Sequence, residues 1–239
     1  MIKIERTDTY GWEAAVRGMR NPKNSWANSD SHYCWEPQYP GGGCFGCELN
    51  SDRNCRVDKY IVGKNDFGLM KTLASAGTDH GKFMRMITVT ADLTAPLYWW
   101  KEYDTYKVGT VADSCSTMHK IHEKKFERSD FSVEHLKPRM LEVLDVTIYN
   151  LNACRGIFLE TKDKTWWWQM IQLLPSSYNQ KRTVQLNYAV LKNMYHARKN
   201  HKLDEWHSFC QWVETLPYSE LITGWEDYGY GLFQNTRRT

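Results

Sequence analysis

The chain has 239 residues, 41% of them hydrophobic, and a formal net charge of +3 at pH 7. This length predicts one sizeable core, and the small charge argues against a nucleic-acid partner while leaving room for an anionic small ligand. The sequence has no apolar run of about 18 residues and its start, MIKIERTDTYGWE, has no signal-like apolar stretch. We therefore expect a cytoplasmic protein with no membrane partner.

The first half predicts short strands and helices around one long irregular segment. Alternating apolar and charged residues predict a strand at 1–7, and Asp8 or Thr9 can cap a helix through 10–20. Residues 21–63 are rich in Gly, Pro, Asn, Ser and Cys, which predicts an irregular insertion. Three elements follow: a helix DFGLMKTLASAG capped by Asn65 and ended by Gly77, a strand over 83–96, and a helix LYWWKEY opened by Pro96.

The second half predicts mainly helices. The segment 107–117 is small and polar, which is typical of a loop. Apolar residues at helical spacing predict helices over 139–160, 182–200 and 203–216. Together these elements predict an α+β (α/β-like) single domain over residues 1–239, with a small mixed sheet and long helices.

Aromatic residues are abundant, with eleven Trp and fourteen Tyr. Such side chains are enriched at protein interfaces and around planar ligands, although core packing explains most individual cases. This composition favours an oligomer or a pocket for a flat ligand.

Four cysteines fall in the insertion, in the stretch CWEPQYPGGGCFGCELNSDRNC. The pair Cys44 and Cys47, with Cys34 and Cys55 on either side, can supply four tetrahedral zinc ligands, and His32 is nearby. Free thiols and disulfides are the alternatives, and disulfides fit poorly with an intracellular protein.

The sequence has none of the common catalytic motifs: no Ser-His-Asp arrangement, no phosphate-cradling P-loop, no G-x-G-x-x-G and no H-E-x-x-H. One polar pair stands out in the predicted helix NYAVLKNMYHAR. Asn187 and Arg198 are eleven residues apart, which is close to three helical turns, so both side chains are expected on one face about 16 Å apart.

The stretch LLPSSYNQKRTVQLNYAVLKNMYHAR resembles the C-terminal signature of flavin-dependent thymidylate synthases (ThyX). In that family a Leu-Pro precedes a helix that carries an Asn and then a Leu-Arg. The Leu-Pro at 174–175, Asn187 and Arg198 keep the family's spacing without a gap, with Ala197 in place of the Leu. Trp206 corresponds to the Trp of the family's next segment after a one-residue insertion.

A looser match lies upstream, in APLYWWKEYDTYKVGTVADSCST. In its register Glu102 replaces a nucleotide-contacting Gln. An Arg-His-Arg motif of the family is replaced by Thr105, Tyr106 and Lys107. Further on, a Ser, a Glu, a second Ser and an Arg of the family are replaced by Thr110, Asp113, Cys115 and Thr117, in that order. The family's phosphate-gripping Arg before the Leu-Pro has no counterpart, because Gln169 and Gln172 are the polar residues there.

The resemblance implies a thymidylate synthase-complementing protein fold and a homotetramer that binds FAD between subunits. It also implies methylation of dUMP, or of a related pyrimidine deoxynucleotide, at C5, with methylenetetrahydrofolate as carbon donor and NADPH as reductant. Reduced flavin supplies the hydride, so no protein nucleophile is required. The residues that the resemblance implies are Arg198 for catalysis, Asn187, Tyr106, Lys107 and Thr110 for the cofactor, and Glu102, Asp113, Ser114, Cys115, Ser116, Thr117 and Arg198 for the substrate.

Two other hypotheses remain at this point. Cys115 could attack the pyrimidine ring, although the neighbouring Asp113 would oppose the lowered thiol pKa that this requires. Alternatively, the chain is a catalytically silent member of the fold that works as a zinc-dependent binding or structural module through residues 32–55.

Overall fold

The computed structural model describes residues 2–34 and 60–224. The expected zinc ligands Cys44, Cys47 and Cys55 lie outside these ranges. The described strands are β1 (Lys3–Tyr10), β2 (His32–Tyr33), β3 (Tyr60–Ile61), β4 (Thr88–Pro96), β5 (Thr110–Ser114) and β6 (Asn179–Asn187). The described α-helices are α1 (Trp12–Arg20), α2 (Lys64–Ser75), α3 (Leu97–Tyr103), α4 (Thr117–Lys120), α5 (Pro138–Thr161), α6 (Lys164–Leu173), α7 (Tyr188–Arg198), α8 (Asp204–Glu214) and α9 (Glu220–Thr223). Short 3₁₀ helices cover Asn21–Lys23, Trp26–Asn28, His80–Arg85 and Arg128–Asp130.

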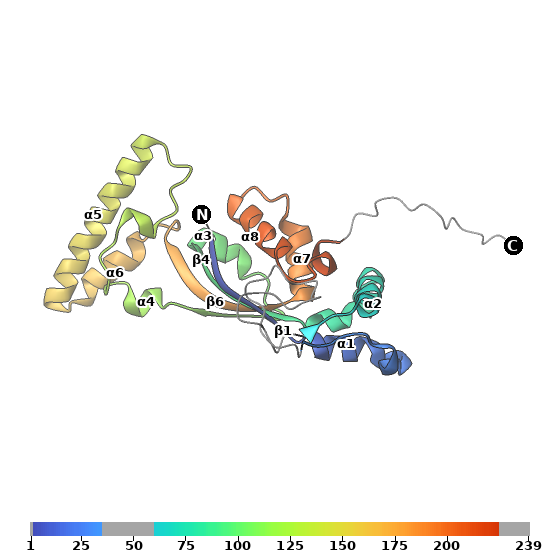
Figure 1. Ribbon diagram of the computed structural model, residues 1–239. Coiled ribbons are helices and arrows are strands. Elements are labelled where there is room, and N and C mark those ends of the chain that lie inside the picture. The colour runs from blue at the N-terminus through green and yellow to red at the C-terminus, as the bar shows by residue number, and fades with distance from the viewer. Residues whose placement is uncertain (1, 35–59, 225–239) are drawn as a thin grey trace, which may run out of the picture.

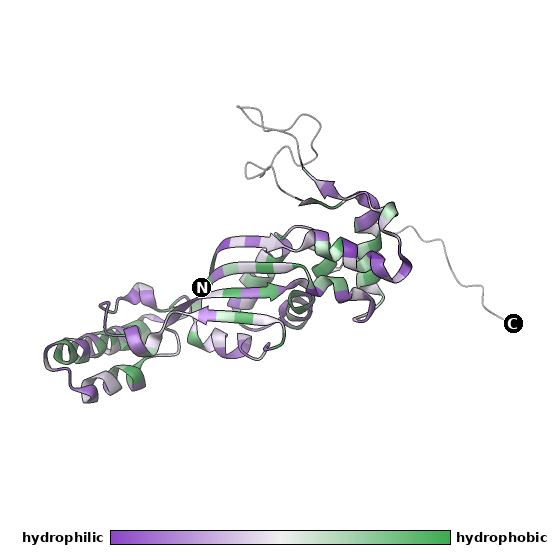
Figure 2. Cartoon of the chain, turned by 90° about the horizontal axis from the view of Figure 1, so that it is seen from below, coloured by the Kyte–Doolittle hydropathy of each residue, from purple (hydrophilic) through white to green (hydrophobic). Residues whose placement is uncertain are grey.

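The centre of the molecule is a four-stranded sheet with the strand order β1-β4-β6-β5. Its three strand pairs are all antiparallel, whereas we expected a mixed sheet. Val89, Ala91, Leu93 and Ala95 of β4 are buried on one face of the sheet because alternate residues of a strand point to opposite faces. The helices α3, α7 and α8 cover this face (Figure 1), and the opposite face is open to view from below (Figure 2). The α+β class that we predicted is confirmed.

Much of the aromatic content lies in the core between the sheet and these helices. Trp99 contacts Trp100, Tyr103 and Trp206, with ring centroids 4.9, 5.3 and 4.8 Å apart. Each of these four side chains is at most 1% exposed. Burial raises the pKa of Tyr103 well above its usual value, so its hydroxyl stays protonated. Core packing therefore explains these four aromatic residues.

A second group of buried side chains lies in an arm formed by α4, α5, α6 and their connections, on the left of Figure 1. Its buried members are Ile121, Phe126, Phe131, Leu144, Leu151 and Met170. After the arm the chain returns to the sheet, because β6 follows α6 and pairs with both β4 and β5. Among the described residues, none of the helices is both long and apolar enough to cross a membrane.

Several sequence predictions agree with the structure. A helix begins directly after Pro96, and helices occupy most of 139–160 and 203–216. The strand predicted at 1–7 is present as β1. The strand predicted at 83–96 begins later, at Thr88, because a 3₁₀ helix covers His80–Arg85.

Two predictions in the second half were wrong. The helix expected over 182–200 begins only at Tyr188, because residues up to Asn187 form β6. The expected loop at 107–117 contains β5. Both corrections have one cause: β6 pairs with β4 over nine residues and with β5 over five, and this tertiary pairing outweighs weak local preferences.

The helix starts near the insertion also differ from prediction. Neither Asp8 nor Thr9 caps α1; its N-cap is Gly11, with φ of 88° and no side-chain cap. A Cβ at Gly11 would lie 2.0 Å from the Met86 carbonyl oxygen, so only glycine fits. The N-terminus of α2 is capped by Asp30, a residue distant in sequence. The Asp30 carboxylate accepts hydrogen bonds from the backbone N–H groups of Asn65 and Asp66 over 2.8 and 3.0 Å.

The described ends of the insertion are anchored to the core. Strands β2 and β3, one at each end, pair with each other. The buried Arg20 of α1 donates from Nε to Oδ1 of the buried Asp66 of α2 over 2.6 Å. Asp66 Oδ2 accepts hydrogen bonds from the hydroxyls of Ser29 and Ser31 over 2.6 and 2.5 Å. This network fixes residues 29–31 against both helices.

Candidate functional site

Arg198, the last residue of α7, lies where α7 meets the end of α3. Its Nε donates a hydrogen bond to Tyr106 Oη over 2.9 Å, and its Nη1 donates to Glu102 Oε2 over 2.5 Å. Its guanidinium carbon lies 4.9 Å from the ring centroid of Trp206. The side chain is only 19% exposed, so its charge faces protein groups rather than bulk water. Four residues that the resemblance matched thus form what we call the Arg198 cluster: Glu102, Tyr106, Arg198 and Trp206.

His201 orients the carboxylate of this cluster, and the sequence analysis did not single it out. Its Nε2 lies 3.1 Å from Glu102 Oε2. The backbone N–H of Leu203 donates to His201 Nδ1 over 3.2 Å, which assigns the ring proton to Nε2, facing Glu102. Glu102 Oε2 therefore accepts a hydrogen bond from Arg198 and lies in close contact with His201. The only sequence signal for this role was the position of His201 three residues after Arg198.

Asn187 is the N-cap of α7 and not a residue of its helical face as we expected. Its Oδ1 accepts a hydrogen bond from the backbone N–H of Val190 over 3.0 Å. Its Nδ2 makes a long contact of 3.5 Å with the Gly109 carbonyl oxygen. Asn187 and Arg198 nevertheless contact the same connection between α3 and β5, Asn187 at Gly109 and Arg198 at Tyr106. The two polar side chains therefore lie at opposite ends of α7, against this connection.

Strand β5 separates the other candidate residues into two groups. Lys107 and Thr110 lie at its start, where Thr110 Oγ1 donates to the Tyr106 carbonyl over 2.5 Å. Cys115, Ser116 and Thr117 follow its end, about 13 Å further along at strand spacing. Lys107 and the 115–117 loop therefore lie at opposite ends of β5.

Within β5, neighbouring residues point to opposite faces of the sheet. Ser114 is paired with Arg182 of β6, and Asp113 is paired with Thr183. Ser114 and Arg182 share the face on which Val184 and Leu186 are buried, whereas Asp113 lies on the open face. Asp113 and Ser114 were both expected to contact the substrate, but they project in opposite directions.

Two residues of β6 that the sequence analysis missed hold the end of β5. Gln180 Nε2 donates to the Cys115 carbonyl oxygen over 3.0 Å and to Thr117 Oγ1 over 2.8 Å. Arg182 Nε donates to Gln180 Oε1 over 3.0 Å, and its Nη1 donates to Asp104 Oδ1 over 2.7 Å. The sequence signal that would put them on one face of a strand with Val184 and Leu186 was weak, because only these last two residues are apolar.

The Ser116 and Cys115 side chains have separate surroundings. Ser116 caps α4, since its Oγ accepts a hydrogen bond from the His119 backbone N–H over 3.1 Å. Cys115 is exposed and its thiol is free. By contrast, Cys210 is buried, and this burial raises the pKa of its thiol to about 11.

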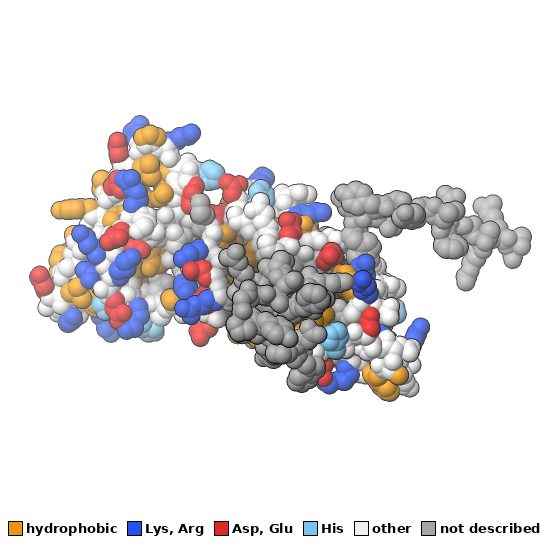
Figure 3. All heavy atoms as spheres, viewed as in Figure 1, with side chains coloured by type: hydrophobic (Ala, Val, Ile, Leu, Met, Phe, Trp, Pro, Cys, Tyr) orange, Lys and Arg blue, Asp and Glu red, His pale blue; other side chains and the backbone are white. Residues whose placement is uncertain are grey.

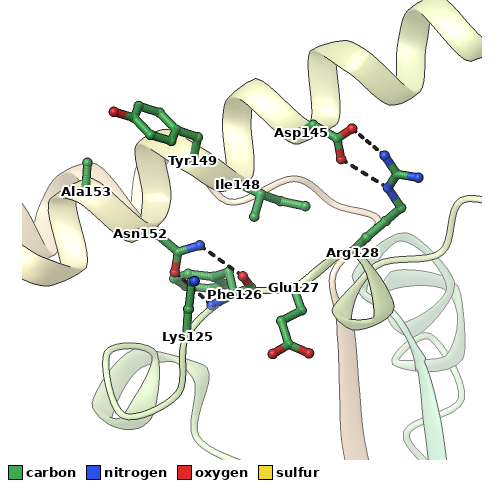
Figure 4. A pocket seen from close by; sticks show the side chains of 9 residues that line it. All are labelled: Lys125, Phe126, Glu127, Arg128, Asp145, Ile148, Tyr149, Asn152 and Ala153. Carbon is green, nitrogen blue, oxygen red and sulfur yellow. Dashed lines mark hydrogen bonds and ion pairs between the residues drawn. The ribbon is translucent and has the colours of Figure 1, made fainter.

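A hollow of about 660 Å³ lies on the arm, between α5 and residues 125–128 (Figure 4). Arg128 and Asp145 form an ion pair at its edge, with Nε to Oδ1 at 3.0 Å. Asn152 bonds both the N–H and the carbonyl of Phe126, each over 2.9 Å. The hollow contains none of the residues matched to the family, so we place the candidate site at the Arg198 cluster instead.

The predicted zinc site has no support from the part of the chain that the structure describes. Cys34 is buried and has a free thiol. Across 2–34 and 60–224, the structure contains no group of three or more His, Cys, Asp or Glu side chains that could hold a metal ion.

No protein-family model and no curated protein sequence matches the chain. Solved structures do match it. One is flavin-dependent thymidylate synthase ThyX from Helicobacter pylori, complexed with FAD and dUMP, with a TM-score of 0.61 and 14% identity over 92% of this chain and 97% of that one. The chain has the ThyX fold.

Two further structures agree with this assignment. Another structure of Helicobacter pylori ThyX with FAD and dUMP has a TM-score of 0.61 and 15% identity, covering 93% of this chain and 97% of that chain. The UMP/dUMP methylase PolB from Streptomyces cacaoi, bound with 5-Br dUMP, has a TM-score of 0.54 and 13% identity, covering 93% and 95%. The ThyX fold thus extends over nearly the whole chain although little sequence identity remains, and the resemblance read from the 174–206 spacing is confirmed at the level of fold.

Proposed function

We propose that the chain is a flavin-dependent enzyme that methylates dUMP, or a related pyrimidine nucleotide, at C5. Methylenetetrahydrofolate would be the carbon donor and NADPH the reductant. One observation carries the proposal: the four residues of the Arg198 cluster come from separate segments matched to the family, and they meet in a chain with the ThyX fold.

Arg198 would contact the pyrimidine and stabilise the negative charge that develops on the ring as C5 becomes reactive. Its position supports this role, because a guanidinium that is only 19% exposed interacts more strongly with a developing charge than one in water. The rings of Trp206 and Tyr106 lie against the Arg198 guanidinium, and the Glu102 carboxylate binds its edge. These contacts limit the orientations that the guanidinium can adopt. The side chain is thus oriented before the substrate arrives.

The residues around the start of β5 fit a flavin cofactor, whose reduced ring would supply the hydride. The Asn187 amide keeps an Nδ2 donor that is only weakly engaged at 3.5 Å, which suits a ring carbonyl. Lys107 is exposed and provides a cation for a cofactor phosphate. Tyr106 and Thr110, joined by the hydrogen bond from Thr110 Oγ1, fix the backbone between them.

A homotetramer is part of the same proposal, and the outer face of α5 supports it. Val143, Val146 and Tyr149 are 57%, 61% and 74% exposed, and hydrophobic side chains are visible on the arm in Figure 3. Exposed apolar patches of this kind mark protein–protein contacts.

The absorption spectrum of the purified protein tests the cofactor, and incubation with dUMP, methylenetetrahydrofolate and NADPH tests the reaction through the appearance of dTMP. We expect flavin absorption and product formation. We expect Arg198→Ala to abolish dUMP-induced thermal stabilisation while the circular dichroism spectrum is unchanged. Colourless protein that takes up no FAD and gains no stability with dUMP would refute the proposal.

A further inference from the structure

Arg182 lies beside the loop that follows β5. It is paired with Ser114 across the β5–β6 ladder, and the two side chains share one face of the sheet, which brings their Cβ atoms to about 5 Å from each other. Gln180, two residues before it, binds Thr117 Oγ1 over 2.8 Å and the Cys115 carbonyl over 3.0 Å. The cationic side chain of Arg182 therefore lies beside the hydroxyl groups of Ser114 and Thr117.

The guanidinium of Arg182 is held in a defined orientation. Its carbon lies 4.1 Å from the ring centroid of Trp100, which is buried and donates its own N–H to the Gln180 carbonyl over 3.0 Å. Its Nε and Nη1 donate to Gln180 and Asp104. Nη2 makes no hydrogen bond to any residue that the structure describes. The side chain is 14% exposed, so this remaining donor is oriented and only partly hydrated.

The partner of Arg182 is one that an anion can replace. The Asp104 side chain is 50% exposed, and an ion pair with so exposed a carboxylate contributes little to stability. A phosphate offers three acceptor oxygens in a geometry that matches the guanidinium fork, and such pairs are stronger. Exchange of Asp104 for a phosphate is therefore favourable.

The position of Arg182 also suits a ligand that reaches the Arg198 cluster. Asp104, which binds Arg182, is two residues from Glu102, which binds Arg198. The two arginines thus flank the C-terminal end of α3. One ligand with a ring at one end and a phosphate at the other can contact both guanidinium groups.

We propose that Arg182, with the hydroxyls of Ser114 and Thr117, binds the phosphate of the nucleotide substrate, and that it replaces the phosphate-gripping arginine missing from the segment before Leu174. This inference rests on the proposed function for the identity of the ligand. It assigns the phosphate to a residue of β6 that sequence matching does not indicate.

Calorimetric titration of the full chain with three ligands tests the inference: dUMP, deoxyuridine and 2-deoxyribose 5-phosphate. For the wild-type protein we expect dUMP to bind about 10- to 100-fold more tightly than deoxyuridine, the range for charge-assisted hydrogen bonds. Arg182→Gln should lose most of this ratio and leave deoxyuridine binding unchanged. Arg182→Lys keeps the charge without the planar fork and should fall between the two.

Asp104→Asn is the matched control, because it breaks the same ion pair and keeps the guanidinium. We expect it to preserve or increase the affinity for both phosphate compounds. An equal loss in Asp104→Asn and Arg182→Gln would mean that the ion pair has only a structural role, and would overturn the inference.

The outcomes separate this inference from the proposed function. If dUMP binds and the ratio survives Arg182→Gln, the phosphate inference is wrong and the proposed function stands. If 2-deoxyribose 5-phosphate binds through Arg182 but deoxyuridine does not bind and Arg198→Ala has no effect, the anion site stands and the pyrimidine assignment fails. If none of the three ligands binds, both are wrong.

Discussion

Arg198 is restrained by a carboxylate, a phenol and an indole, and each of these contacts depends on the shape of a guanidinium. Lysine at this position would keep the charge but lose the planar fork and the stacking on Trp206. We therefore expect Arg198→Lys to weaken dUMP binding by about tenfold or more, equivalent to about 1.5–3 kcal/mol. Calorimetric titration measures the change.

Lys199→Ala, at the adjacent exposed position, is the control for Arg198→Lys and should bind dUMP as the wild-type protein does. If Arg198→Lys also binds dUMP normally, a simple positive charge is sufficient at this position and the guanidinium geometry has no role.

Asn187 combines a structural role with a proposed cofactor role, and two substitutions separate them. Serine can cap α7 as Asn187 Oδ1 does, whereas alanine cannot. We expect Asn187→Ala to lower the free energy of unfolding by about 1 kcal/mol, and Asn187→Ser to retain stability but lose FAD, because it lacks the amide donor. Urea unfolding and the flavin absorbance per chain report the two effects. Full FAD retention in the serine variant would leave Asn187 as a helix cap only.

At the scale of single residues, the sequence singled out Arg198 and its partners Glu102, Tyr106 and Trp206, but not the contacts between them. The uninterrupted spacing from Leu174 to Arg198 identified a segment whose end faces protein groups. The contacts with Glu102 and His201, and the location of Arg182 beside Ser114, depend on how α3 and β5 pack against later segments. Contacts over such separations follow from tertiary packing, which residue spacing does not encode.

At the scale of elements, helices with a strong apolar periodicity were predicted, whereas strands without a clear apolar pattern were not. The helix α5 carries apolar residues at helical spacing, and its position was predicted closely. Strand β6, with the sequence NQKRTVQLN, has only two apolar residues, Val184 and Leu186, too few to define a period. Strand β5 is short, and β6 is its only described strand partner. Strand β6 forms along the edge of β4, and β5 forms along β6.

The outer face of α5 allows a test of assembly. Glutamates introduced at Val143 and Val146, which are more than half exposed, should leave the arm folded. In a tetramer they would put two charges per chain into an apolar contact, which costs several kcal/mol. We expect the double variant Val143→Glu, Val146→Glu to be monomeric in size-exclusion chromatography with light scattering. Lys164→Glu, at the exposed start of α6, is the matched control and should remain tetrameric. A tetrameric double variant would exclude this face from the interface.

At the scale of the whole molecule, the Arg20–Asp66 network connects the insertion to the core. Burial alone would raise the pKa of Asp66, but hydrogen bonds from Ser29, Ser31 and Arg20 outweigh it and hold the pKa below its usual 3.8. A lowered native pKa means that the carboxylate contributes stability fully above pH 3.8, and loses this contribution as the pH falls through the native pKa.

We expect Asp66→Asn to lower the free energy of unfolding at neutral pH by about 3 kcal/mol, because it leaves the buried Arg20 without a counter-charge. The variant should also lose stability less steeply than the wild-type protein below pH 3.8. Urea unfolding across acidic pH measures both effects. Parallel pH profiles for the two proteins would show that Asp66 does not titrate with folding.

The arm and the sheet bury their apolar side chains in two groups that, among the described residues, have no member in common. Loss of packing in one group does not directly open the other, so the two regions can differ in how often they open locally. In the described part of the chain, the arm has six buried apolar residues and is the smaller unit. Contact between copies through α5 would suppress local opening of the arm and leave the sheet unchanged. The order of the arm, but not that of the sheet, would therefore depend on protein concentration.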